Sequence, residues 1–148
     1  MLFKNVISGF TAALFGGAMI AMPAMAQDTQ TPRFSLELNN AADTEQGGCR
    51  LTYVAANQTG LAIEAISYQV AVFDADGGVT DLLVLEFGNL IAGKTKVVQF
   101  DLAGRGCADI SRITVNEVAE CALADGGVGD FCLTGLETAS RGAIQFGI

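Results

Sequence analysis

The side chains with the greatest capacity for chemistry in this sequence are acids in turns. Asp74 and Asp76 lie in the stretch "DADGG", between two apolar runs. A calcium loop of the EF-hand type needs an oxygen ligand at its fifth position and a bidentate glutamate at its twelfth. Counted from Asp74, these positions hold Gly78 and Leu85, and Glu86 comes one residue late with its side chain on the opposite face of a strand. Because glycine readily adopts the positive φ of tight turns, the pattern predicts a hairpin and not a calcium site.

The sequence lacks several of the residues that enzymes usually use for catalysis. The chain has no histidine, the commonest general base, zinc ligand and triad member. Pairs of carboxylates can act alone, as in glycosidases, and the candidates are Asp74 with Asp76 and Glu117 with Glu120. The chain has no tryptophan and two tyrosines, so no aromatic platform for a sugar is evident. We predict that the protein is not an enzyme and needs no cofactor; an enzyme using carboxylates alone requires two acids brought together across the fold.

Four cysteines, Cys49, Cys107, Cys121 and Cys132, form the second group of reactive side chains. An even count in an exported chain indicates two disulfides, and four cysteines allow three pairings. We favour Cys121–Cys132, which closes the loop "ALADGGVGDF", together with Cys49–Cys107, which joins distant segments. A zinc site is the alternative, but the sequence offers neither histidine nor a Cys-x-x-Cys pair. No metal site is predicted.

Residues 1–26 have the pattern of a secretory signal peptide. Lys4 precedes a long uncharged apolar run, and Pro23 is followed by Ala24-Met25-Ala26. This order of a charged start, an apolar core and a cleavage site with small residues predicts cleavage before Gln27. An uncleaved membrane anchor is the alternative, because the run is nearly long enough to span a bilayer. We expect a periplasmic or secreted bacterial protein with no membrane anchor after cleavage.

The charge of the chain limits the classes of partner that we expect. Eight basic and sixteen acidic residues give a net charge of −8, and the basic residues are scattered singly. Binding to nucleic acid or to an anionic membrane needs clustered Lys and Arg, so neither partner is expected. The 122 residues that follow the signal peptide are enough for one domain with a core of its own.

The rest of the chain reads as short strands separated by turns. Phe34, Leu36 and Leu38 alternate with polar residues, as in a half-buried strand. The run 79–88 is more continuously apolar, which predicts cover on both faces or a long loop beside it. We predict a single immunoglobulin-like antiparallel β-sandwich of about six to seven strands, stapled by disulfides. The expected strands lie at 33–38, 49–57, 65–73, 79–88, 95–102 and 110–118.

These strands set the expected boundaries. Residues 27–33 form a flexible N-terminal segment, 34–121 the sandwich, and 122–148 a disulfide-closed loop and C-terminal tail. In the tail, Ile144, Phe146 and Ile148 alternate, so the tail either adds an edge strand or stays outside the sheets.

The span 53–102 resembles the small immunoglobulin-like domains of the FxLYD type found in exported bacterial proteins. The similarity rests on "NQTG" at the end of a strand, "FDADG" after a long alternating strand, and "LIAGKT" before another strand. Ala92 stands where that family commonly has proline, and the Phe-x-Leu-Tyr-Asp motif is absent. The resemblance implies the fold and a bacterial envelope setting, and it implies no catalytic residues. Asn57 also matches a glycosylation acceptor, but turn formation explains the motif better.

The loop between Cys121 and Cys132 is the candidate recognition site. It holds Asp125 and Asp130 and ends at Phe131. A closed loop that exposes an aromatic side chain suits recognition, although Phe131 can equally pack under the sandwich. We predict a non-catalytic exported envelope protein that serves as a protein-binding or accessory module. The alternative is a periplasmic protein that binds a small ligand or calcium through its acidic loops.

Overall fold

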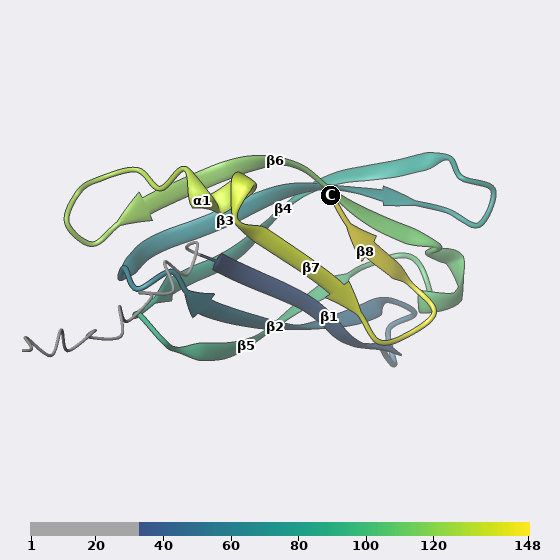
Figure 1. The fold of residues 1–148 in the computed structure, drawn as a ribbon. Coiled ribbons are helices and arrows are strands. Elements are labelled where there is room, and N and C mark those ends of the chain that lie inside the picture. Colours follow the sequence, from purple (N-terminus) through teal and green to yellow (C-terminus); the bar gives the residue numbers. More distant parts are fainter. Residues whose placement is uncertain (1–32) are drawn as a thin grey trace, which may run out of the picture.

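The computed structural model describes residues 33–148, which form a β-sandwich of two four-stranded sheets (Figure 1). The predicted signal peptide and most of the predicted N-terminal segment lie outside the described residues. In spatial order, the first sheet contains β5 (Thr95–Leu102), β2 (Cys49–Gln58), β1 (Arg33–Asp43) and β7 (Leu136–Ser140). The second contains β4 (Val79–Leu90), β3 (Ile63–Phe73), β6 (Arg112–Leu123) and β8 (Gln145–Gly147). Two short helices, η1 (Cys107–Asp109) and α1 (Phe131–Thr134), precede β6 and β7.

The first six strands have the distribution of an immunoglobulin sandwich. In that fold strands A, B and E are neighbours in one sheet, and C′, C and F are neighbours in the other. Here β1, β2 and β5 occupy the first set of places, and β4, β3 and β6 occupy the second. The predicted fold class is therefore confirmed.

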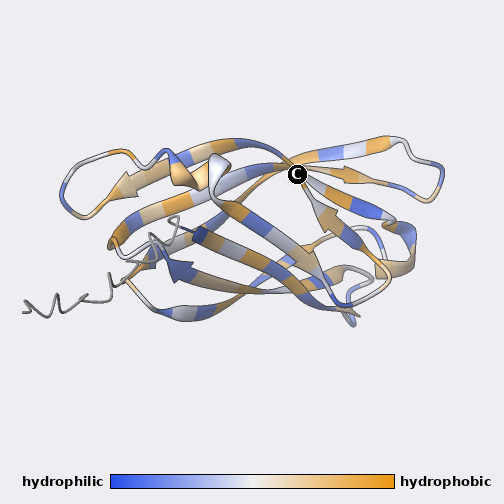
Figure 2. Cartoon of the chain, in the orientation of Figure 1, coloured by the Kyte–Doolittle hydropathy of each residue, from blue (hydrophilic) through white to orange (hydrophobic). Residues whose placement is uncertain are grey.

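Alternation along the strands builds the core. Phe34, Leu36 and Leu38 of β1 are buried, and their polar neighbours are not. Figure 2 shows the same alternation of hydrophobic and hydrophilic residues along most strands. At the centre of the core, the Tyr53 ring meets Phe87, Phe100 and Phe146 edge to face, a geometry that aromatic rings favour over direct stacking.

The "DADGG" stretch is the turn of the β3–β4 hairpin, as predicted. Asp74 Oδ1 accepts hydrogen bonds from the backbone N–H groups of Asp76 at 3.0 Å and Gly78 at 2.8 Å. The Asp74 N–H donates to the Gly78 carbonyl at 2.9 Å. Gly77 has a φ of 84°, a conformation that glycine adopts without strain. The Asp74 carboxylate thus binds its own turn.

The C-terminal tail adds two strands, which makes eight among residues 33–148 where six to seven were expected. β7 pairs with β1 and β8 pairs with β6, and both pairs are parallel, unlike the antiparallel pairs between the first six strands. The direction of β7 follows from α1: the Phe34 N–H donates to the Gly135 carbonyl at 3.0 Å, so β7 starts where β1 starts. The sandwich therefore continues past the expected boundary at residue 121 and ends near Gly147.

Of the two arrangements predicted for the run 79–88, cover on both faces is wrong. β4 is an edge strand of the second sheet, and the Leu82 and Val84 side chains are 59% and 52% exposed. Leu85 and Phe87 of the same strand are buried. A continuous apolar run indicated double cover, but only one of its faces meets the core.

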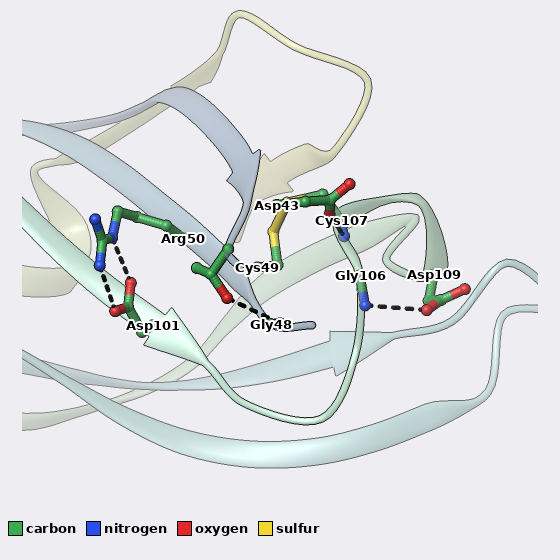
Figure 3. Close-up of a disulfide and its surroundings, with 9 residues drawn as sticks. Asp43, Gly48, Cys49, Arg50, Asp101, Gly106, Cys107 and Asp109 are labelled. Carbon is green, nitrogen blue, oxygen red and sulfur yellow. Dashed lines mark hydrogen bonds and ion pairs between the residues drawn. A yellow bond between two sulfur atoms is a disulfide. The ribbon is translucent and has the colours of Figure 1, made fainter. Parts of the chain in front are cut away.

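Both favoured disulfides are present, and they lie at opposite ends of the sandwich. Cys49–Cys107 joins the start of β2 to η1, at the end where β1 finishes (Figure 3). Cys121–Cys132 joins the last part of β6 to α1, at the end where β1 begins. We call these the Cys49–Cys107 end and the Cys121–Cys132 end. Within residues 33–148, no helix has the length and apolar character needed to cross a membrane.

Candidate functional site: an apolar groove at the Cys121–Cys132 end

A groove of about 450 Å³ lies at the Cys121–Cys132 end, between the loop after β2 and the loop after β6. Its apolar lining comes from Leu61, Leu123, Val128 and Phe131, and Asp130 contributes to its rim. Val128 is 80% exposed and Leu61 is 44% exposed. Exposed apolar side chains that gather around one groove are candidates for contact with another molecule, whereas single ones are normal on a protein surface.

The β6–α1 loop is ordered by its own hydrogen bonds. The Leu123 N–H donates to the Gly127 carbonyl and the Gly126 N–H donates to the Leu123 carbonyl, each at 2.9 Å. Asp125 Oδ1 accepts from the Gly127 N–H at 2.9 Å. The predicted recognition residue Asp125 therefore stabilises the turn from which the loop continues to Val128.

Phe131 is buried, with 8% of its surface exposed. This is the second of the two arrangements that the sequence allowed, in which the ring packs under the sandwich. A Cβ atom on Gly129 would lie 2.5 Å from a carbon of the Phe131 ring, so only glycine fits beside it. Phe131 forms part of the groove lining from within the core, and Val128 presents the exposed apolar surface instead.

Tyr68 anchors α1 to the core. Its hydroxyl donates to the Cys132 carbonyl at 2.6 Å, across the interior of the sandwich. Burial raises the pKa of the Tyr68 hydroxyl, so it stays protonated and remains a donor. The disulfide fixes the side chain of Cys132 and Tyr68 fixes its backbone, so α1 is held at two points.

Asn57 holds the turn that contributes Leu61 to the groove. Its side-chain amide donates to the Leu61 carbonyl at 2.8 Å and to the Leu90 carbonyl at 3.0 Å. Its Oδ1 accepts from the N–H and the hydroxyl of Thr59 at 3.1 and 2.7 Å. Asn57 is fully buried, so the side chain that matched a glycosylation acceptor instead shapes the turn that places Leu61.

The acids singled out in the sequence are not gathered at the groove. Asp74 and Asp76 lie in the β3–β4 turn, and Glu117 and Glu120 are exposed on β6, where they pair across the sheet with Gln69 and Ser67. No group of three or more acids, cysteines or histidines placed to hold a metal occurs in residues 33–148. Of the loop acids, the exposed Asp130 is the one that lines the groove.

Sequence reasoning found the loop but missed its contact residues. Val128 stands alone between glycines, and Leu61 follows a turn, so neither belongs to a periodic pattern. The groove offers shape and apolar contact with an acidic rim. Comparison with protein-family models, with curated proteins and with solved structures gives no match for this chain.

Proposed function

We propose that this chain is a non-catalytic exported protein, periplasmic or secreted, that binds another protein through the groove at the Cys121–Cys132 end. The observation that carries the proposal is the exposure of Val128 and Leu61, which come from two different loops and line one groove. Both loops are held in place: the loop with Val128 by the Cys121–Cys132 disulfide, and the turn with Leu61 by the Asn57 side chain. A site held in place before binding loses less conformational freedom when its partner arrives.

The groove suits a partner segment that inserts an apolar side chain and carries a basic residue beside it. Asp130 lies on the rim, and the whole chain has a net charge of −8. Opposite charge at the rim of an interface mainly increases the rate of association and selects among partners. The export proposal is supported by the signal-like leader and by two disulfides, which persist in oxidising compartments. Membership of the FxLYD-type domains remains a proposal, and its support is the three turn sequences "NQTG", "FDADG" and "LIAGKT".

The test is crosslinking in the native organism, with recovery of the tagged protein and identification of crosslinked partners by mass spectrometry. The variant Val128→Asp places a charge in the groove at an exposed position, where the fold should tolerate it. The matched control is Val97→Asp, because Val97 is 62% exposed on β5, which does not line the groove. We expect one reproducible envelope partner that Val128→Asp loses and Val97→Asp retains.

Two results would overturn the groove as the binding site: recovery of the protein alone, or a partner retained by Val128→Asp. A rise in melting temperature on adding millimolar calcium would favour the ligand-binding alternative, because a ligand stabilises the state that binds it. The same preparations test export, since the mature protein is expected to begin at Gln27.

A further inference from the structure

The outer edge of β4 is open over a short, mostly apolar stretch. β4 pairs with β3 on one side, and on its other side it pairs with no strand among residues 33–148. The register with β3 is unbroken from Asp81 to Glu86, and its irregularities lie beyond these residues. An edge strand presents unpaired N–H and C=O groups, which natural sheets usually protect with charge, bulges or short length.

The direction of the backbone groups shows which residues are unpaired. The Val72 carbonyl accepts from the Thr80 hydroxyl, and the N–H of Asp74, just after β3, donates to the Gly78 carbonyl, so the backbone groups of Val72 and Asp74 face the β4 side. The Phe73 carbonyl faces the other way and accepts from Ser111. Because backbone groups alternate in direction along a strand, the β4 residues opposite the intervening β3 positions direct their N–H and C=O groups to the open edge. These residues are Leu82, Val84 and Glu86.

Basic side chains protect both ends of this stretch. Lys96 Nζ donates to the Phe87 carbonyl at 2.7 Å and lies 3.4 Å from the Asn89 carbonyl. At the other end, Arg105 binds the Thr80 hydroxyl and lies 2.5 Å from an Asp81 carboxylate oxygen. The open part is therefore limited to residues 82–86.

The other three edge strands are better protected. β7 and β8 have five and three residues, and short edges offer little to pair with. On its outer face, β5 alternates Val97 with the polar Gln99 and Asp101. In β4 the outer face instead presents Leu82 and Val84 side by side, both more than half exposed.

We propose that a second copy of this chain pairs antiparallel with β4, with Val84 opposite Val84 of the second copy. This register matches the whole open stretch to itself and places Leu82 opposite Glu86 of the other copy. In this register Leu82, Val84 and Glu86 each meet a residue of the other copy whose backbone groups also face the edge, which antiparallel hydrogen bonding requires. The sheet that contains β4 in one copy then continues into the same sheet of the other copy.

The order of charges along the edge favours a second copy as the occupant. Arg105 lies at the Thr80 end, apolar residues follow, and Glu86 lies at the far end without an ion pair among the described residues. Antiparallel pairing reverses this order, so Glu86 of each copy lies diagonally opposite Thr80 of the other, within reach of Arg105. Asp81 and Lys96 bring one further acid and one further base, so the paired edges carry no excess of either sign.

The pairing is expected to be weak and salt-dependent. Five residues on each side form an interface below the about 1,200 Å² typical of stable complexes. Two molecules that each carry a net charge of −8 repel each other, and salt screens that repulsion. Self-association should therefore appear at high protein concentration and increase with ionic strength.

Sedimentation equilibrium of the purified protein, from micromolar to millimolar concentration at low and high salt, tests the proposal. We expect a reversible dimer that Val84→Lys abolishes and that Val97→Lys retains, with circular dichroism showing that both variants remain folded. A monomer at all concentrations overturns the proposal, and so does a dimer that Val84→Lys retains. The groove variant Val128→Asp should leave the dimer unchanged, so this proposal and the proposed function fail separately.

A crosslink tests the register. Cα atoms of a hydrogen-bonded antiparallel pair lie about 5.5 Å apart, inside the about 4.4–6.8 Å range that a disulfide spans. Val84→Cys should therefore oxidise rapidly to a covalent dimer in which the two native disulfides remain intact. Val97→Cys should not. Equal rates for the two variants would contradict the register.

Discussion

The two ends of the sandwich are each closed by a disulfide, but they are organised differently. At the Cys49–Cys107 end the bond joins residues 58 positions apart. Its neighbours are an exposed ion pair, Arg50–Asp101, and two exposed carboxylates, Asp43 and Asp109, that accept from backbone N–H groups (Figure 3). At the Cys121–Cys132 end the bond joins residues 11 positions apart. There it is accompanied by buried side chains, Tyr68 and Asn57, that bind backbone carbonyls.

This difference indicates a division of roles. A crosslink between distant positions restricts the unfolded chain most strongly, so the Cys49–Cys107 bond mainly supplies global stability. A crosslink around a short loop restricts it less, but together with buried hydrogen bonds it determines the shape of a surface. The apolar groove lies at the Cys121–Cys132 end, where the disulfide closes a short loop.

The largest expected effect comes from removing each disulfide. From loop length, replacing Cys49 and Cys107 together by serine should lower the free energy of unfolding by about 4 kcal/mol, and replacing Cys121 and Cys132 by about 3 kcal/mol. Urea unfolding followed by tyrosine fluorescence measures both losses. Replacing Cys121 and Cys132 should also reduce the recovery of the binding partner, and this reduction should be larger than the loss of stability alone would cause. If the first pair lost less stability than the second, the assignment of roles would be wrong.

A second prediction concerns Asn57, which holds the Leu61 wall. Asn57→Ala leaves the carbonyls of Leu61 and Leu90 without their donor, and such losses cost about 1–3 kcal/mol for each buried group left unpaired. Asn116→Ala is the matched control, because Asn116 is exposed and donates only to the Gln69 side chain. The control should change stability by less than about 0.5 kcal/mol. Equal effects in thermal unfolding would show that Asn57 does not fasten this end.

The sequence was sufficient for what depends on alternation. Phe34, Leu36 and Leu38 were assigned to the core from their period of two, and they are buried. Both disulfides were favoured from spacing and compartment, and both are present. β7 was not predicted, because its sequence "LETAS" is short and mostly polar, and its pairing with β1 depends on a contact across most of the chain.

The site was less predictable than the fold. A run such as 79–88 shows that side chains are apolar, but not whether a second layer covers them, so the exposure of Leu82 and Val84 was missed. The loop acids were visible, whereas the groove depends on Val128 and Leu61, which meet only after β2 and β6 are placed. Periodicity identifies faces of strands, and it does not identify surfaces built from two loops.

The two core tyrosines provide a third, smaller test. The Tyr68 hydroxyl anchors α1, whereas the Tyr53 hydroxyl is buried and has no hydrogen-bond partner among the described residues. Tyr68→Phe should lower the free energy of unfolding by about 1 kcal/mol and increase hydrogen exchange in residues 129–135. Tyr53→Phe should be neutral or stabilising, because it removes a buried polar atom without breaking a bond. A greater loss in Tyr53→Phe would contradict these roles.

The smallest effect is expected from the ion pair at the Cys49–Cys107 end. Arg50 hydrogen-bonds Asp101 through two nitrogens at 2.7 Å each and lowers the pKa of that carboxyl. A folded-state pKa below the unfolded value gives stability that is present above the unfolded pKa and is lost as pH falls through the folded pKa. Asp101→Asn should therefore lose less stability between pH 7 and pH 3 than the unaltered protein does, as measured by urea unfolding. Asp130→Asn is the control at the other end, since Asp130 makes no ion pair within residues 33–148. High salt should reduce the difference, because both partners are exposed and their attraction is screened. An unchanged pH dependence in Asp101→Asn would show that this end owes its stability to the disulfide alone.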